Sequence, residues 1–284
     1  MKLYKTRQGN LLQDQERFWL LDQVWDELIN REDLHGWLQA VTATAKELPA
    51  GQAASWCEQE ILAPIGTQEV WAAGVTYLRS RDARMEESKG SGGADFYDKV
   101  YEAERPELFF KSFPYRVAAH GESVYIRRDS VWNVPEPELT LFINSNGHIQ
   151  GYTAGNDMSS RSIEGENPLY LPQAKVYERS AALGPCLYVP KEPISRSTVI
   201  HMTISREGRE VYTGEVPISQ IKRSLTELAG WLFRETDYPA GCFLMTGTCL
   251  VPPNDFTLQE GDKVDIRIGG IGVLTNTIQY RPTR

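Results

Sequence analysis

The stretch VPEPELTLFINSNGHIQGYTAGND, residues 134–157, contains two apolar runs that are separated by a short polar segment. That segment, Asn-Ser-Asn-Gly at 144–147, is typical of the turn in a β-hairpin. The two runs are therefore expected to be neighbouring antiparallel strands. The simplest register pairs Ile143 with His148 across the turn.

Acidic residues lie at the open end of this predicted hairpin. With that register Glu138 faces Thr153 and Glu136 faces Gly155, and Asp157 follows at the end of the second strand. Successive side chains of a strand point to opposite faces of the sheet, so residues two apart share a face. The three acids are then expected on one face, at one end. This prediction depends on the register, because a slip of one residue moves a side chain to the other face.

Three carboxylates in one partly buried site repel one another, so protons, basic side chains or a metal ion must neutralise them. Hard oxygen ligands in this number suit Mg²⁺, and also Mn²⁺ or Ca²⁺, better than zinc. Three protein ligands leave coordination positions for water or for a chelating substrate. The alternative interpretation is that the three acids lie exposed on a solvated face and bind nothing.

The whole chain has the composition of a globular protein with an excess of acidic residues. It has 284 residues, of which 41% are hydrophobic and 24% are charged, and its net charge is −8. This length and composition fit one large domain, alone or with a smaller one. The negative charge disfavours binding to nucleic acid or to an anionic membrane.

The cysteines and the N-terminus bear on the cellular location. Cysteines stand at positions 57, 186, 242 and 249, and none forms a C-x-x-C pair, which argues against a zinc ribbon or a redox motif. The opening residues MKLYKTRQGN lack the apolar segment of a signal peptide. No apolar run reaches the roughly 18 residues of a membrane span. We therefore expect a cytoplasmic protein with no membrane partner and no nucleic-acid partner.

The pattern of hydrophobic residues changes near residue 67. Residues 1–66 are expected to form a small N-terminal α/β domain, with a helix within residues 30–51 that is capped by Asn30 and ends near Pro49. Residues 67–284 contain many short strand-like runs that are punctuated by Gly, Pro and Asn. The predicted fold class is α+β, mainly β, with most strands in this larger domain.

Three motifs of the larger domain are EPELT, the hairpin NSNGHIQGYTAGND and the late stretch MTGTCLVPPNDFTLQEGDKVDIRIGGIGVLTN. Together they resemble the fumarylacetoacetate hydrolase superfamily over about residues 67–280. The resemblance implies a mixed β-roll and a catalytic domain that binds Mg²⁺ through Glu136, Glu138 and Asp157. It also implies a substrate of the 2-oxo acid type, and a homodimer or a dimer of dimers.

Further motifs are ENPLYLPQAKVYERSAALGP, PELFFKS and the run from VTY to RDARMEE. They look like the 2-keto-3-deoxy-D-arabinonate dehydratase branch of the superfamily. That resemblance implies a carbon–oxygen lyase (hydro-lyase) of pentose metabolism, which removes water from a 2-keto-3-deoxy sugar acid and gives 2,5-dioxopentanoate. By position, Lys175 matches the active-site lysine of the branch, and Glu107 matches its active-site glutamate.

Dehydration requires a base for the C3 proton beside the ketone and an acid for the departing C4 hydroxyl. We expect Lys175 to be the base and Glu107 the acid, although the sequence allows the roles to be exchanged. A surface lysine with a glutamate salt-bridge partner is the simpler alternative for this pair. The residues expected to bind substrate oxygens are Tyr77, Arg84, Lys111 and Thr248, with Gln173 and Arg161 as weaker candidates.

The histidines separate dehydration from hydrolysis. They stand at positions 35, 120, 148 and 201, and none lies within residues 77–104. Carbon–carbon hydrolases of the superfamily typically carry a His–Glu pair there, which activates water. The missing histidine favours dehydration over a metal-dependent hydrolase or decarboxylase of diketo acids, such as acylpyruvates or fumarylacetoacetate. A non-catalytic metal-binding scaffold is the remaining alternative.

Overall fold

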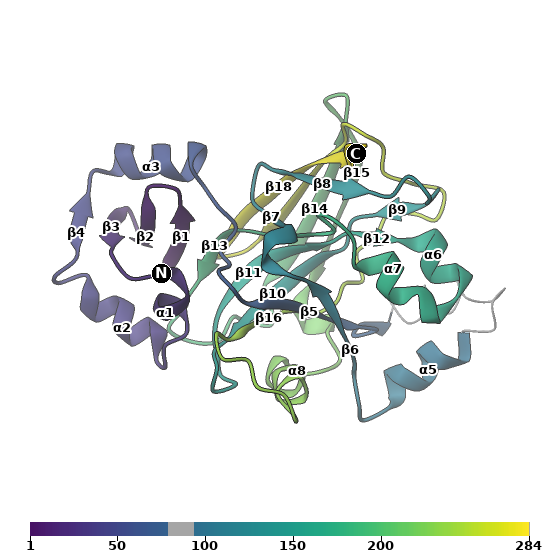
Figure 1. Cartoon of the computed structure of the whole chain (residues 1–284), viewed down its shortest axis with the longest axis horizontal. Coiled ribbons are helices and arrows are strands. Elements are labelled where there is room, and N and C mark those ends of the chain that lie inside the picture. Colours follow the sequence, from purple (N-terminus) through teal and green to yellow (C-terminus); the bar gives the residue numbers. More distant parts are fainter. Residues whose placement is uncertain (79–93, 284) are drawn as a thin grey trace.

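The computed structural model of the chain describes residues 1–78 and 94–283, in which strand residues outnumber helical residues. Most strands belong to one large mixed sheet (Figure 1). Its order is β4 (Lys46–Leu48), β3 (Arg17–Leu21), β2 (Gly9–Asp14), β1 (Lys2–Thr6), β13 (Ala181–Tyr188), β11 (Ile149–Asp157), β10 (Pro137–Ile143), β16 (Cys242–Met245), β5 (Glu69–Gly74) and β6 (Glu107–Ser112), with β7 (Val117–Ala118) paired to β13.

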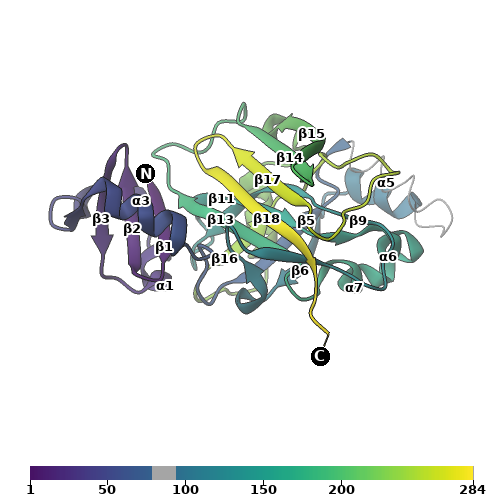
Figure 2. The same ribbon diagram turned by 90° about the horizontal axis from the view of Figure 1, so that it is seen from above.

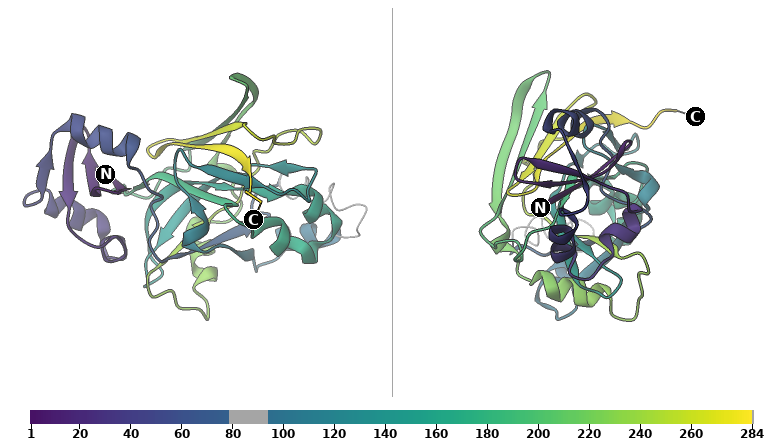
Figure 3. Two further views of the ribbon diagram at one scale, coloured as in Figure 1. Left: turned by 45° about the horizontal axis from the view of Figure 1, so that its top comes forward. Right: turned by 90° about the vertical axis from the view of Figure 1, so that its left-hand side faces the viewer.

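A smaller sheet lies across the central strands of the large one (Figure 2). Its order is β15 (Arg209–Pro217), β14 (Val199–Arg206), β17 (Lys263–Ile268), β18 (Gly272–Tyr280) and β8 (Ser123–Ile126). Figure 3 shows the long β14–β15 hairpin at the edge of this sheet. A two-stranded ribbon is formed by β12 (Ser159–Ser160) and β9 (Asn133–Val134).

The helices are short and flank the sheets. In the part of the chain that the structure describes, none is both long and apolar enough to span a membrane. The α-helices are α1 (Trp25–Ile29), α2 (Leu34–Val41), α3 (Ala50–Gln59), α5 (Ala94–Glu102), α6 (Arg161–Glu166), α7 (Leu171–Lys175) and α8 (Leu225–Leu232), and the 3-10 helices are η2 (Pro114–Arg116), η3 (Pro168–Tyr170) and η4 (Ile218–Gln220).

The central strands are buried on both faces. All seven residues of β10 are buried, which explains why its sequence reads as an almost continuous apolar run. Leu139 packs in a core between the two sheets, together with Leu274 of β18. Phe142 points to the other face and packs in a second core with Leu34 of α2. The predicted α+β, mainly β, fold class is confirmed.

The N-terminal segment continues the large sheet, because Leu3 of β1 pairs with Leu187 of β13 (Figure 1, left). The division into domains 1–66 and 67–284 stays a prediction. The single helix expected within residues 30–51 is wrong. Helix α2 ends at Val41, strand β4 follows, and Pro49 begins helix α3.

Local chemistry explains this difference. The hydroxyl groups of Thr42 and Thr44 donate to backbone carbonyls at the end of α2, so they compete with further helical turns. Pro49 lacks an N–H and is tolerated at a helix start but not in an interior. The cap of α2 is Asp33 rather than Asn30, and its carboxylate accepts a hydrogen bond from the Gly36 N–H at 3.1 Å.

The hairpin forms as predicted, but its register differs by two residues. Ile143 pairs with Ile149 rather than with His148, and the Asn144 N–H donates to the His148 carbonyl across the turn. A further irregularity follows directly, because Phe142 pairs with Gly151. The turn and this irregularity each shift the pairing by one residue.

Together the two shifts move the register by two residues. Each side chain therefore stays on the face of the sheet on which it was predicted. Glu138 pairs with Gly155 rather than Thr153, and the Asp157 N–H donates to the Glu136 carbonyl at 2.9 Å. Residues that pair directly across two strands share a face. Glu136, Glu138 and Asp157 are consequently on one face, as predicted, although the predicted partners were wrong.

Candidate metal centre and active site

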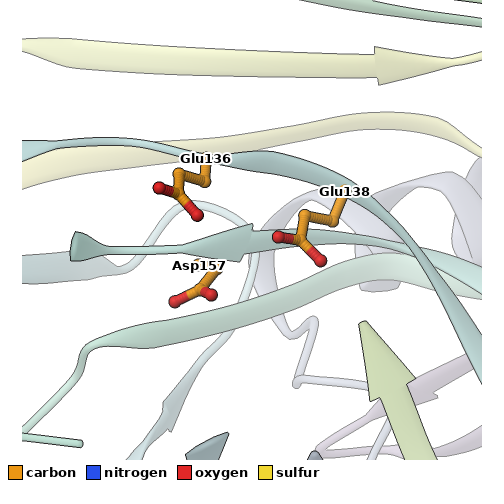
Figure 4. A group of neighbouring side chains, drawn as sticks. All are labelled: Glu136, Glu138 and Asp157. Carbon is orange, nitrogen blue, oxygen red and sulfur yellow. The ribbon is translucent and has the colours of Figure 1, made fainter. Parts of the chain in front are cut away.

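Glu136, Glu138 and Asp157 converge at the end of the hairpin. One carboxylate oxygen from each lies within 4.8 Å of the others, and Figure 4 shows the three groups pointing toward a common space. Their side chains are buried, with 3%, 1% and 1% of their surface exposed. The alternative of three exposed surface acids is therefore wrong.

Such a group is costly without positive charge nearby. Two unit charges 4.8 Å apart repel by about 3–4 kcal/mol at the effective dielectric constant of a protein, which is a large part of the stability of an ordinary domain. Burial, followed by the charges of Asp157 and Glu136, raises the pKa of Glu138 well above its usual range. The Gly247 N–H donates a hydrogen bond to Glu138 Oε2 at 2.6 Å.

Lys175 lies among these acids and is itself buried. Its Nζ is 2.7 Å from Glu136 Oε2, 3.1 Å from Asp157 Oδ2 and 2.5 Å from Ser159 Oγ. The simpler interpretation of Lys175 as a surface lysine is wrong. Helix α7 places it, because Lys175 is the last residue of that helix and Pro172 lies in its first turn.

Helix α6 contributes two more ionised groups to the same cluster. Arg161 donates to Glu136 Oε1 at 2.7 Å, and Glu164 lies 3.6 Å from both Arg161 Nε and Lys175 Nζ. The hydroxyl group of Ser160 caps this helix by accepting from the Ile163 N–H at 3.4 Å. Sequence reasoning ranked Arg161 low and missed Glu164. The (i, i+3) spacing of Arg161 and Glu164 was the available signal.

Glycines leave room around the acids. Gly247 has φ +89°, a left-handed conformation that directs its N–H toward Glu138. A Cβ atom there would lie 2.1 Å from Thr76 Oγ1. Gly74 pairs with Glu107 across β5 and β6, and a Cβ atom on Gly74 would lie 2.0 Å from Glu107 Oε2. The carboxylate of Glu107 thus occupies the space above Gly74.

A cleft joins these groups. It encloses about 370 Å³, including the part that is open to solvent. Glu107 and Thr248 line it, and their contacts with a substrate stay predictions. Its other lining residues include the three acids, Lys175, Arg161, Gly247 and Gly74. Glu107 belongs to β6 and Lys175 to α7, and both line the cleft.

The other predicted site residues lie elsewhere. Tyr77 is buried in the core between the sheets, and burial raises the pKa of its phenol. Lys111 is fully buried beneath Asp157 and is not among the lining residues described for the cleft. Gln173 is exposed, and its carbonyl accepts from Arg127. Arg84 lies outside the described residues.

The four histidines are all outside the cleft lining. His148 pairs with Glu32, His201 pairs with Glu215, and His120 accepts from the Thr275 N–H. None of these rings is near the acids. The described part of the cleft therefore lacks a histidine that could activate water.

The donor set fits a hard divalent ion. The three carboxylates supply oxygen ligands only, which Mg²⁺, Mn²⁺ and Ca²⁺ prefer. Burial and then the charges of Asp157 and Glu136 raise the pKa of Glu138, and a dication between the three carboxylates would offset these effects. The cleft beside the trio leaves space for a further ligand to the ion.

Comparisons with known proteins agree with this geometry. Residues 83–279 match the family described as "Fumarylacetoacetate (FAA) hydrolase C-terminal". The "Probable 2-keto-3-deoxyxylonate dehydratase" of Haloferax volcanii is 47% identical over 225 residues, 79% of this chain and 76% of that protein. The 2-dehydro-3-deoxy-D-arabinonate dehydratase of Saccharolobus solfataricus is 42% identical over 225 residues, 78% of this chain and 75% of that protein.

A solved structure covers all of this chain. It is a 2-keto-3-deoxy-D-arabinonate dehydratase complexed with magnesium and 2,5-dioxopentanoate, with a TM-score of 0.83, 33% sequence identity, and coverage of 100% of both chains. The family match includes the hairpin, the three acids, Lys175 and Glu107. The protein belongs to the fumarylacetoacetate hydrolase family.

Proposed function

We propose that this protein is a Mg²⁺-dependent hydro-lyase that removes water from a 2-keto-3-deoxy sugar acid. The substrate is 2-keto-3-deoxy-D-arabinonate or a close relative, and the product is 2,5-dioxopentanoate. The observation that carries the proposal is the buried trio of carboxylates with Lys175 beside Glu136 and Asp157. The names of two relatives that are 47% and 42% identical support the same reaction class.

Glu136, Glu138 and Asp157 hold the metal in this proposal. Bound Mg²⁺ supplies a Lewis acid that polarises the 2-keto group and so makes the C3 protons more acidic. Mn²⁺ and Ca²⁺ have the same ligand preference and are the alternatives. Arg161 donates a hydrogen bond to Glu136 and so fixes the orientation of the Glu136 carboxylate.

Lys175 and Glu107 transfer the protons. Lys175 Nζ takes a proton from C3, and the Glu107 carboxyl gives one to the departing C4 hydroxyl, which leaves as water. Movement of a C5 hydrogen to C3 then converts the resulting C3=C4 alkene into the C4=C5 enol, and transfer of the enol hydroxyl proton to C4 gives the aldehyde without an oxidant. Exchange of C3 hydrogen with deuterated water separates the two roles: Glu107→Gln retains the exchange and Lys175→Met loses it.

Gly74 provides a test of Glu107 that leaves the glutamate in place. In Gly74→Ala the new Cβ displaces the Glu107 carboxylate, whose Oε2 would otherwise be 2.0 Å away. A misplacement of about 1 Å lowers the rate by roughly a hundredfold, so we expect kcat to fall by about that factor. Steady-state kinetics measures kcat, and thermal unfolding measures the stability of the variant.

Gly230→Ala is the matched control for this substitution. Gly230 is exposed on α8, and a Cβ atom there has no neighbour within 4 Å. Its kcat should equal that of the wild type, with a small gain in stability because alanine favours a helix. A Gly74→Ala enzyme with an unchanged kcat would argue against a role of Glu107 in the reaction.

A substrate panel tests the proposed function. Purified protein is incubated with 2-keto-3-deoxy pentonates and hexonates and Mg²⁺, and the product is detected by mass and by an NADP-linked semialdehyde dehydrogenase. We expect a product lighter by one water and a coupled signal that EDTA abolishes. Mg²⁺-dependent loss of acylpyruvate absorbance would instead indicate a hydrolase. Thermal stabilisation by Mg²⁺ without any turnover would indicate a non-catalytic scaffold.

Assembly and location remain predictions. A homodimer or a dimer of dimers rests on the family resemblance, and light scattering of the purified protein measures it. None of the four cysteines, which all lie in the described residues, forms a disulfide, and this supports a reducing compartment such as the cytoplasm.

A further inference from the structure

Lys111 is a second buried lysine beneath the candidate metal centre. It lies on β6, and its side chain has 0% exposure. Its Nζ is 2.5 Å from Asp157 Oδ1, 3.0 Å from the carbonyl oxygen of Met158 and 2.5 Å from the carbonyl oxygen of Lys175. The contact with Asp157 is an ion pair, and the two contacts with carbonyl oxygens are hydrogen bonds.

The three acceptors belong to two different parts of the active site. Asp157 and Met158 are at the end of β11, whereas the Lys175 carbonyl is at the end of α7. Lys111 therefore connects a proposed metal ligand to the backbone of the proposed base. The Lys175 carbonyl is also held by Ser180, whose hydroxyl donates to it at 2.8 Å.

The Lys111 ammonium group is thus held by three protein oxygens. Its ammonium group contacts the Asp157 carboxylate through Oδ1, whereas Lys175 contacts the same carboxylate through Oδ2. Lys175 lines the cleft, and Lys111 is not among the lining residues described. The two lysines thus approach Asp157 from different sides.

We propose that Lys111 is a positioning residue that fixes the Asp157 carboxylate and the end of helix α7 for metal binding. It replaces the substrate-binding role expected from the sequence. The inference rests on the proposed function, because it takes Asp157 as a metal ligand. It assigns Lys111 no contact with substrate.

The sign of the effect on metal affinity distinguishes positioning from simple charge balance. Removing a positive charge beside a cation site, by itself, reduces repulsion and tightens Mg²⁺ binding. Removing a group that orients a metal ligand weakens binding, typically by 10–100-fold. Lys111→Met keeps the length of the side chain and removes the charge, the ion pair with Asp157 and the two hydrogen bonds.

Calorimetric titration of purified protein with Mg²⁺ makes the comparison. We expect Lys111→Met to bind Mg²⁺ about tenfold or more weakly than the wild type. Lys175→Met is the matched variant, because it also removes an ammonium group that contacts Asp157. Lys175, however, lines the cleft, whereas Lys111 is not among the lining residues described. That variant should bind Mg²⁺ as tightly as the wild type or more tightly.

Arg206→Met controls for loss of a buried ion pair elsewhere. Arg206 binds both oxygens of the fully buried Asp262, at 2.7 and 2.8 Å, in the small sheet. The Arg206→Met substitution should lower the melting temperature and leave the Mg²⁺ affinity unchanged. If Lys111→Met does not fold, Lys111→Gln is used, since its amide can still donate to two of the three oxygens.

The outcomes separate this inference from the proposed function. Mg²⁺ affinity that is unchanged or higher in the Lys111 variant, while the wild type binds Mg²⁺, overturns the positioning role alone. A wild type that binds no divalent metal overturns the proposed function. A crystal structure of the Lys111 variant with Asp157 in its original orientation would also contradict the positioning role.

Discussion

Lys175→Met should lower kcat by about a thousandfold at saturating Mg²⁺ and substrate, within the range that positioned acids and bases contribute. The thioether has the length of the lysine chain but cannot accept a proton from C3. Lys175 is buried and lies within 3.1 Å of both Glu136 and Asp157, so its geometry relative to the proposed metal is closely defined. Single-turnover kinetics with a chemically detected product measures the loss.

The same variant should retain the metal. Lys175 Nζ touches oxygens that belong to the proposed metal ligands, and its removal eliminates a competing cation. Calorimetry should therefore show Mg²⁺ binding at least as tight as in the wild type. A rate within tenfold of the wild type would refute Lys175 as the proton acceptor, whatever its metal affinity.

Glu138→Gln should change stability in opposite directions with and without metal. In the absence of Mg²⁺ we expect the variant to be more stable than the wild type by about 1–3 kcal/mol, since neutral replacements of buried charges are often stabilising. The amide keeps an oxygen for the Gly247 N–H and removes the repulsion from Asp157 and Glu136. Mg²⁺ should stabilise the wild type but not the variant, and turnover should be lost.

The pH dependence has a defined sign. The pKa of Glu138 in the folded protein lies well above its ordinary value of 4.5. Between these two values the folded protein holds a proton that the unfolded chain has released, so metal-free stability falls as pH rises. Glu138→Gln removes this contribution. Thermal unfolding in a pH series, with EDTA or Mg²⁺, measures both effects, and equal stabilisation of both proteins by Mg²⁺ would exclude Glu138 as a ligand.

Glu136→Gln and Asp157→Asn should also weaken Mg²⁺ binding and abolish turnover. Their metal-free stability should fall rather than rise, because each carboxylate is paired with buried cations: Glu136 with Arg161 and Lys175, and Asp157 with Lys111 and Lys175. Removing one partner of a buried ion pair leaves an uncompensated charge. Unfolding experiments without metal should therefore show a gain in stability for Glu138→Gln and a loss for these two variants.

The central hairpin was predictable from sequence because its face depends on parity rather than on the exact partners. The turn at 144–148 and the irregularity beside Phe142 each moved the register by one residue, and together they preserved the shared face of the acids. One such shift alone would have separated Asp157 from the two glutamates. Local sequence does not specify these irregularities. The prediction that the three acids share a face therefore had a weaker basis than the prediction of the two strands.

The other groups around the three acids were harder to predict from sequence. Lys175 and Glu107 came from a family resemblance, whereas Lys111 was assigned a substrate contact that its buried position does not offer. Glu164 and Ser159 were missed, because their approach to Lys175 depends on how helices α6 and α7 pack beside the hairpin. Contacts between segments that are far apart in sequence leave no periodic pattern in the chain.

Anomalous diffraction from a crystal of the protein grown with Mn²⁺ tests the metal centre directly. A single anomalous peak should lie between the carboxylates, within bonding distance of an oxygen of Glu136, of Glu138 and of Asp157. Lys175 Nζ should lie outside the coordination sphere. A peak elsewhere, or no peak beside the trio at saturating Mn²⁺, would contradict the proposal that these three acids hold the catalytic metal.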